Sequence, residues 1–327
     1  MVSELTDSSP KVSVIIPLYN KAAFIERAID SILSQTVQDF EIVVVNDGST
    51  DGGEIIVNAY TDSRIRLINQ ENGGVSVARN NGVYASRAEF VAFLDADDEW
   101  LPDFLDTVLR LRRKWPDAGL YGTNRIIVNT SPKYKETLVL CHQRYDEGIY
   151  PYFKMSALGA HPFCMSSVAI PKSVLMDVGL FRTNIKYYED MEIYARIGLS
   201  YKIVCSPLHL VRYYKEDEYA ATSTLSLIPE IHPIIQLVNE LKERDELDSR
   251  WNGCSDLNLY LDSLNLCQAT NRMLLNRQSA RPYILRVTHK ELFWRKWMLY
   301  LYSFIPEFIL PALRDAYGYI RSFVSDK

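Results

Sequence analysis

Short apolar runs alternate with amphipathic stretches along the first 115 residues. Four runs rich in β-branched and aromatic residues predict strands buried on both faces, at 12–17, 40–45, 65–68 and 90–94. Apolar residues at helical spacing between and after them predict helices, at 21–35, 54–61, 72–86 and from Pro102 to before Pro116. Strand and helix therefore alternate four times, which is the pattern of an α/β fold with a doubly wound, mostly parallel sheet flanked by helices.

The remainder of the chain is less periodic. Between 118 and 215 the pattern is mixed and predicts a helix over 189–199 and three strands, at 167–170, 201–205 and 208–213. From about 229 onward the pattern is helical. We therefore expect an α/β domain over 10–220, made of the halves 10–115 and 116–220, followed by a helical C-terminal region over 225–327.

Composition places the chain among ordinary globular proteins. Of its 327 residues, 47% are hydrophobic and 24% are charged, and the net charge of −5 gives no electrostatic support to nucleic-acid binding. The five cysteines form no C-x-x-C pair, which favours a reducing compartment over a disulfide framework. The first ten residues do not resemble a signal peptide, and no run of 18 apolar residues occurs, so a cytoplasmic location is expected.

Polar clusters follow each of the four predicted strands of the first half. They lie at 19–20, 46–47, 69–74 and 95–98. Because ligands of doubly wound sheets bind outside the carboxyl ends of the strands, we expect these clusters to meet in one crevice.

Three aspartates form the sharpest of these clusters. Asp95, Asp97 and Asp98 follow a buried strand, and carboxylates so close together repel each other unless a cation lies between them. Oxygen ligands of this kind suit Mg²⁺ or Mn²⁺, which also bind substrate phosphates. The alternative is a solvated turn with helix-capping aspartates ahead of Pro102.

Two further groups could bind a nucleotide. Asp47 could accept a hydrogen bond from a nucleobase or a ribose hydroxyl, or form an Asx-turn. The residues 72–74 (NGG) begin a helix that carries Arg79, and a helix N-terminus beside a cation suits a pyrophosphate, although Arg79 could equally form a plain surface ion pair. Neither G-x-G-x-x-G nor a P-loop motif occurs, so the dinucleotide fold and the P-loop NTPases are unsupported.

Glu189 and Asp190 begin a predicted helix in the second half. Acidic residues are common at helix N-termini because they complement the helix dipole. The functional alternative is a general base that takes a proton from an acceptor hydroxyl.

The motifs VSVIIPLYN, VVVNDGSTD, NGGVSVARNNG and FLDADD, in this order, resemble the N-terminal half of a family 2 glycosyltransferase with a GT-A fold. The stretch PKSVLMDVGLF and the later Glu189-Asp190 pair are similar to the acceptor half of that family. The resemblance covers about residues 10–215. It implies an inverting enzyme of hexosyl or N-acetylhexosaminyl type that uses a nucleotide-diphosphate sugar, most often a UDP-sugar.

The resemblance also implies roles for single residues at the donor. Pro17 and Tyr19 would line the base pocket, and Asp47 would bind the base. Asn72 would lie on the nucleotide-sugar side, and Arg79 would approach the nucleotide or its phosphates.

Metal and catalytic roles follow from the same resemblance. Asp95 would hold the ribose, Asp97 the metal, Mn²⁺ or Mg²⁺, and Asp98 would be a helper or a ligand. Asp190 would be the base, and Glu189 would orient the acceptor. The sequence departs from the family at residues 211–215 (VRYYK), where an Arg-x-His element often stands, which puts a diphosphate or metal contact there in doubt.

Two rival interpretations remain. A nucleotidyltransferase on a related sheet would need a basic, glycine-rich loop after the first strand, where the chain has 18–21 (LYNK). A non-catalytic nucleotide-sugar or glycan-binding module would retain binding without transfer.

The segment 292–313 is rich in aromatic and aliphatic residues and is broken by Pro306 and Pro311. It could lie at the inner surface of the cell membrane, or it could pack as a helical hairpin on the catalytic domain or on a second copy in a homodimer. A membrane-surface position would suit a lipid-linked acceptor in bacterial surface polysaccharide or glycolipid assembly, a context that comes from the resemblance.

Overall fold

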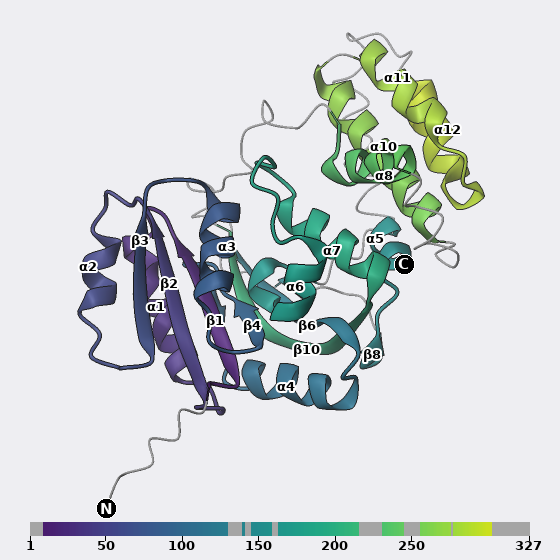
Figure 1. Cartoon of the computed structure of the whole chain (residues 1–327). Coiled ribbons are helices and arrows are strands. Elements are labelled where there is room, and N and C mark those ends of the chain that lie inside the picture. Colours follow the sequence, from purple (N-terminus) through teal and green to yellow (C-terminus); the bar gives the residue numbers. More distant parts are fainter. Residues whose placement is uncertain are drawn as a thin grey trace, which may run out of the picture. The chain divides into compact units, whose positions relative to one another are not determined.

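The computed structural model describes residues 9–129, 139–140, 145–158, 163–215, 231–244, 256–275 and 277–302. The chain divides into two compact units, residues 1–254 and residues 255–327, and each is described by itself (Figure 1).

The alternation predicted for the first half is confirmed. Its elements are β1 (Val12–Leu18), α1 (Ala22–Leu33), β2 (Phe40–Asp47), α2 (Gly53–Asn58), β3 (Ile65–Gln70), α3 (Val75–Ala85), β4 (Phe90–Phe93), β5 (Glu99–Trp100) and α4 (Phe104–Lys114). The last helix begins two residues after Pro102, with Asp103 as its N-cap, so the proline precedes the helix rather than starting it.

Continuous apolar runs mark the strands that are covered on both faces. In β2, Ile42 and Val44 belong to a core cluster that includes residues of α1 and α4, whereas Val43 and Val45 pack with Ala78 of α3. Side chains alternate between the faces of a strand, so a strand with helices on both sides is apolar at most positions. The buried exception in the middle of this sheet is the pair Ser13 and Glu41, in which Ser13 Oγ donates to Glu41 Oε1 at 2.6 Å.

The second half completes the first unit. It contains β6 (Ala118–Asn129), β7 (Val139–Leu140), β8 (Gly148–Ile149), α5 (Tyr152–Ala157), η1 (Met165–Ser167), β9 (Val168–Pro171), α6 (Lys172–Val178), α7 (Glu189–Ser200), β10 (Lys202–Lys215) and α8 (Pro233–Glu243). The two strands predicted over 201–213 are one strand, β10, because its irregular register between Ser206 and Val211 interrupts the apolar pattern without ending the pairing. The long strand β6 was not predicted, since buried polar residues such as Thr123 and Asn124 interrupt its apolar pattern.

One sheet runs through the unit in the order β3-β2-β1-β4-β9-β6-β10-β5, with β7 beside β6 and β8 beside β10. The pairs among β1 to β4 are parallel, and so is β6 with β10, whereas β9 runs antiparallel to both of its neighbours. The expected fold class, an α/β sheet that is mostly parallel and flanked by helices, is therefore confirmed. The chain leaves β1 toward β2 and β3 and returns on its other side at β4, which makes a topological switch point where a ligand crevice is expected.

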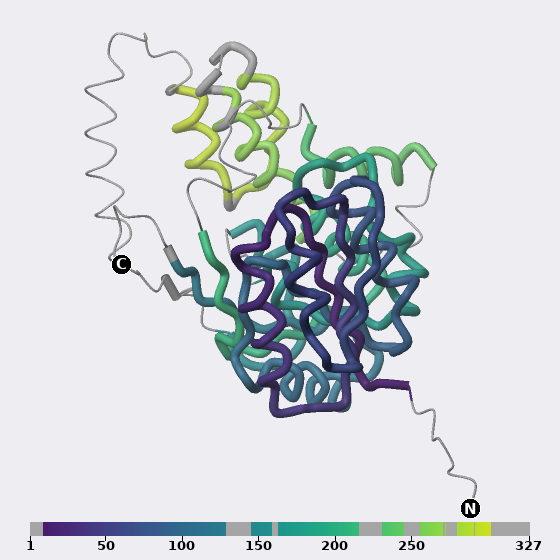
Figure 2. Tube along the Cα trace, turned by 90° about the vertical axis from the view of Figure 1, so that its left-hand side faces the viewer, coloured from purple at the N-terminus to yellow at the C-terminus, as the bar shows by residue number. Residues whose placement is uncertain are grey.

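The second unit is helical. Its described elements are α10 (Asp256–Leu275), α11 (Arg277–Arg286), η3 (Lys290–Leu292) and α12 (Phe293–Tyr302), which lie side by side (Figures 1 and 2). Ala269, Ala280 and Ile284 form its small core. No described helix is both long enough and apolar enough to cross a membrane. Residues 303–313 of the aromatic segment lie outside the described residues.

Helix α8 belongs to the first unit, whose boundary with the second falls at residues 254 and 255. Its apolar side is buried, and Arg182 Nη1 pairs with Glu240 Oε2 at 2.9 Å, which ties α8 to the loop before α7.

Candidate active site

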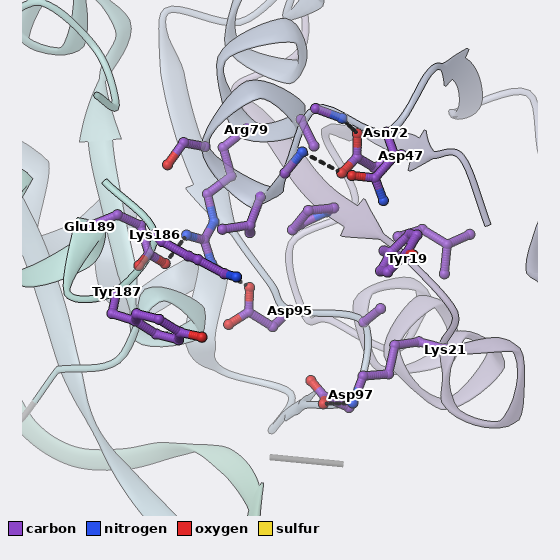
Figure 3. A pocket seen from close by; sticks show the side chains of 18 of the residues that line it. Tyr19, Lys21, Asp47, Asn72, Arg79, Asp95, Asp97, Lys186, Tyr187 and Glu189 are labelled. Carbon is purple, nitrogen blue, oxygen red and sulfur yellow. Dashed lines mark hydrogen bonds and ion pairs between the residues drawn. The ribbon is translucent and has the colours of Figure 1, made fainter. Parts of the chain in front are cut away.

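A pocket of about 1050 Å³ opens at the carboxyl ends of β1, β2 and β4 (Figure 3). Its other wall is the loop 183–187, the start of α7 and the end of β10. The structure brings most of the predicted site residues into this one pocket. All but Asp98 and Asp190 line it, namely Pro17, Tyr19, Asp47, Asn72, Arg79, Asp95, Asp97 and Glu189.

Asp47 fixes the turn that begins α3. Its carboxylate accepts hydrogen bonds from the backbone N–H groups of Gly73 at 2.8 Å and Gly74 at 2.9 Å, and from Gln70 Nε2 at 2.7 Å. Gly74 has a φ of +88°, a conformation that favours glycine. These two N–H groups therefore bind Asp47, whereas we had expected the NGG turn to offer its backbone to a pyrophosphate. The alternative of an Asx-turn at Asp47 also differs from this geometry; the neighbouring Asn46 Oδ1 accepts from the backbone N–H of Ser49, three residues on, at 3.0 Å.

Arg79 bridges the two halves of the unit. Its Nη2 donates to Asp95 Oδ1 at 2.8 Å and its Nη1 to Glu189 Oε1 at 2.9 Å, with only 4% of the side chain exposed. Burial alone would lower the pKa of Arg79, but the charges of Asp95 and Glu189 outweigh it and raise that pKa above its ordinary value. The expectation that Arg79 meets the phosphates differs from this geometry, in which its guanidinium positions two carboxylates.

The carboxylates of Asp97 and Asp98 point to different places. Asp97 lines the pocket, and its Oδ2 pairs with Lys21 Nζ at 2.6 Å. Asp98 is buried, where its carboxyl accepts from Ser166 Oγ and, at 3.2 Å, from Tyr214 N. Burial and the charges of Asp95 and Asp97 raise the pKa of Asp98 well above its ordinary value. The structure thus turns Asp98 away from the pocket, where we had expected a ligand or a helper of the metal.

Ser166 of η1 fixes the loop 95–98 through its hydrogen bonds. Its Oγ donates to Asp98 and accepts from the backbone N–H of Asp95 at 3.1 Å, while its carbonyl accepts from Trp100 Nε1 at 2.6 Å. One serine thereby fixes both the first and the last of the clustered aspartates.

The donor set fits a hard divalent cation. Asp95 and Asp97 expose 28% and 29% of their side chains, and each uses only one carboxylate oxygen in an ion pair. No group of three or more histidine, cysteine or acidic side chains that could hold a metal occurs among the described residues. Mg²⁺ and Mn²⁺ fit a site with few protein ligands, because they retain waters and bind substrate phosphates.

Asp190 begins α7 beside Glu189. Its Oδ1 accepts from the backbone N–H of Met191 at 2.7 Å. Burial, together with the charge of Glu189, raises the pKa of Asp190 to about 6. A carboxylate with such a pKa is ionised at neutral pH and still basic enough to take a proton. Tyr188, just before this pair, has a φ of +65°, which is strained for a bulky residue and sets the direction in which the helix begins.

Sequence reasoning missed several residues of the pocket. Lys21 had a usable signal, since it follows Tyr19-Asn20 at the end of the first strand. The loop 183–187 and the residues 213–215 had no recognisable motif, yet both line the pocket. Lys186 extends into it, with its Nζ 5.8 Å from the centre of the Tyr187 ring (Figure 3).

A family model described as glycosyl transferase family 2 matches residues 13–178. The uncharacterized glycosyltransferase RP339 of Rickettsia prowazekii is 32% identical over 252 residues, which are 75% of this chain and 71% of that protein. The uncharacterized glycosyltransferase EpsJ of Bacillus subtilis is 53% identical over 91 residues, 27% of this chain and 26% of EpsJ. The chain likewise spans only 36% of the putative glycosyltransferase EpsH of Bacillus subtilis.

The fold is shared with solved structures. TarS 1–349 of S. aureus, crystallised in complex with UDP-GlcNAc, superposes with a TM-score of 0.57 at 18% identity, over 84% of this chain and 88% of that one. At this identity the likeness concerns the fold. The family match over half of the sequence, together with the similarity to RP339, identifies the chain as a member of glycosyltransferase family 2.

Proposed function

We propose that this protein is an inverting glycosyltransferase that moves a sugar from a UDP-sugar to a hydroxyl of a glycan or lipid-linked acceptor in bacterial surface polysaccharide assembly. One observation carries the proposal: Arg79 ties Asp95, at the nucleotide side of the pocket, to Glu189, the neighbour of the candidate base. Donor carboxylates and the start of α7 are thereby held around one cavity. The choice of uridine is supported by the neighbour TarS, which was crystallised with UDP-GlcNAc and with UDP.

The nucleotide would enter along the ends of β1 and β2. Tyr19 is 50% exposed and offers an aromatic face to a base, next to Pro17 and the fixed carboxylate of Asp47. Asp95 and Asp97 would hold Mg²⁺ or Mn²⁺, which supplies positive charge for the leaving diphosphate.

Transfer would take place in a single displacement. The Asp190 carboxylate takes the proton of the acceptor hydroxyl. At the same time the oxygen of that hydroxyl bonds to the anomeric carbon from the face opposite the diphosphate. The bond from the anomeric carbon to the phosphate oxygen breaks, and its electron pair leaves with the nucleoside diphosphate. Because the attack comes from the opposite face, the anomeric configuration inverts. Arg79 would hold Glu189, the neighbour of the proposed base, at a fixed position relative to Asp95 on the donor side.

Lys186 is proposed to contact the leaving diphosphate. Four cationic residues line the pocket, namely Lys21, Arg79, Lys186 and Lys215. Arg79 is paired with two carboxylates and Lys21 with Asp97, whereas Lys186 has no carboxylate partner among the described residues. Its ammonium group would supply positive charge to the pocket from the loop 183–187, in a chain that lacks the Arg-x-His element at residues 211–215. Lys186→Ala is expected to weaken UDP binding while leaving uridine binding unchanged. Lys202→Ala, at an exposed lysine outside the pocket, is the matched control.

Thermal unfolding with UDP, GDP, CDP, dTDP and ADP, each with and without Mn²⁺, tests the donor class. A nucleotide that binds only the folded state adds about 2.7 kcal/mol of stability at a hundredfold excess over its Kd. We expect a Mn²⁺-dependent shift with UDP, and Asp190→Asn is expected to retain it while losing transfer. No shift with any nucleotide would refute the proposal, and UDP binding without transfer to any acceptor would favour a binding module.

A further inference from the structure

Helix α12 presents large apolar side chains on two sides. On one side Leu299 and Tyr300 pack against the core of the second unit. On the other side five large side chains remain between 40% and 79% exposed, namely Phe293, Trp294, Trp297, Met298 and Leu301. With about 100° between successive residues, these five fall within one arc of the helix, which we call the α12 apolar face.

The α12 apolar face is a continuous aromatic surface at its N-terminal end. The centre of the Phe293 ring lies 5.5 Å from the centre of the Trp294 ring and 6.2 Å from that of the Trp297 ring. Single exposed apolar residues are ordinary, but a contiguous group of this kind marks a surface that contacts something else. A helix that is apolar on both sides is normally covered on both sides.

The charge around this face differs from that of the rest of the chain. Residues 256–302 contain seven lysine and arginine residues against three aspartate and glutamate residues, although the whole chain carries a net charge of −5. Arg295 and Lys296 lie on α12 itself, and Lys296 Nζ donates to the carbonyl of Val287 at 2.6 Å. At about 100° per residue, Arg295 and Lys296 fall on either side of the arc that holds the α12 apolar face, so two basic residues flank it.

We infer that the α12 apolar face docks on an anionic lipid bilayer, with the helix lying in the plane of the interface. Tryptophan rings favour the boundary between headgroups and acyl chains, and basic side chains beside them attract anionic headgroups. The ten described residues of α12 are too few to span the bilayer.

Charge decides between a lipid surface and a second copy of the chain. A symmetric dimer would place this face against itself, since both partners of such an interface use the same patch. The basic residues of both copies would then approach each other in a region with few acidic residues. An anionic bilayer instead supplies the complementary charge.

Vesicle sedimentation of the purified full chain tests this inference. Wild-type protein is expected to sediment with vesicles of phosphatidylcholine and phosphatidylglycerol, and less with phosphatidylcholine alone or at high salt. Replacing Trp294 and Trp297 together by serine is expected to weaken this binding more than about tenfold. Ile55→Ser, at a 68% exposed position on α2, is the matched control and is expected to bind like wild type.

A second measurement does not depend on the variants. Lipids brominated at shallow acyl positions are expected to quench the tryptophan fluorescence of the wild-type chain in anionic vesicles. The inference is overturned if wild-type protein stays in the supernatant, or if the double tryptophan variant binds as well as wild type. It is also overturned if the tryptophan replacements convert a dimer into a monomer in sedimentation equilibrium without any change in vesicle binding.

Discussion

The pH dependence of transfer tests the position of the proposed base. Asp190 has a pKa of about 6, raised by burial and by the charge of Glu189. The base must be ionised to accept the proton of the acceptor hydroxyl. The rate of the chemical step is therefore expected to be constant above about pH 7 and to fall as the pH drops through 6.

The size of the fall in transfer rate distinguishes an Asp190 with a raised pKa from an aspartate with its ordinary pKa. With a pKa of about 6, about one-tenth of Asp190 is ionised at pH 5, so transfer should be about tenfold slower than at pH 8. An aspartate with its ordinary pKa of 3.8 would stay almost fully ionised at pH 5. The two pKa values therefore predict transfer rates at pH 5 that differ by nearly tenfold.

Single-turnover transfer with saturating donor and acceptor is the appropriate assay, because it excludes the pH dependence of binding and of product release. Glu189→Gln can still accept from Arg79 but removes a charge that raises the pKa of Asp190, so its acid limb is expected at lower pH. A flat wild-type profile between pH 8 and pH 5 would show that the ionisation of Asp190 does not limit the reaction.

The same pKa predicts a gain of stability in Asp190→Asn. The folded state raises the pKa of Asp190, so it binds the proton more tightly than the unfolded chain does, and the ionised form costs stability above pH 6. Asparagine removes this cost, up to about 3 kcal/mol at pH 8, and the advantage should shrink as the pH falls below 6 and vanish below about pH 3, where aspartate is protonated in both states. A variant that loses transfer, by about 10²–10⁴-fold, but melts at a higher temperature cannot be explained by misfolding.

Three further predictions follow from the ion pairs and hydrogen bonds of the pocket. Arg79→Met leaves two carboxylates without their partner and is expected to lower the free energy of unfolding by roughly 3 kcal/mol in urea titrations at pH 7; an unchanged midpoint would contradict the bridging role. Lys21→Met frees Asp97 from its ammonium partner and is expected to tighten Mn²⁺ binding several-fold in calorimetry without nucleotide, whereas weaker binding would make Lys21 part of the cation site. Ser166→Ala removes the hydroxyl donor of the buried Asp98, which then retains only the Tyr214 backbone N–H among its described donors, and is expected to cost about 1–3 kcal/mol in thermal unfolding and to weaken UDP binding.

Much of the fold could be predicted because each element of the first half has a clear hydrophobic pattern. A strand covered on both faces is apolar along most of its length, as β1, β2 and β4 are. The buried polar residues Ser13 of β1 and Glu41 of β2 do not hide this pattern, and they hydrogen-bond to each other. The second half does not follow this pattern. Strand β6 buries Thr123 and Asn124, and β10 is irregular near Ser206, so a pattern based on hydrophobicity misses the first strand and divides the second.

The position of the pocket could be predicted from the sequence. The hydrogen-bond and ion-pair partners of its residues could not. The carboxyl ends of parallel strands meet at one edge, which is enough to bring Asp47, Asp95 and Asp97 together. Whether a carboxylate faces the pocket or the core depends on a neighbour that is distant in sequence. Asp98 turns inward because Ser166, from a segment with no motif, offers it a hydroxyl.

Arg79 shows most clearly why such partners matter for function. Its two hydrogen bonds join Asp95, sixteen residues further along the chain, to Glu189, which is 110 residues away. A guanidinium with little exposure cannot lose either carboxylate cheaply, so the start of α7 is held where the end of β4 places it. For the proposed function, we expect a donor that contacts Asp95 to act through Arg79 on Glu189 and on the adjacent Asp190. This coupling predicts ordered binding, in which the nucleotide sugar precedes the acceptor.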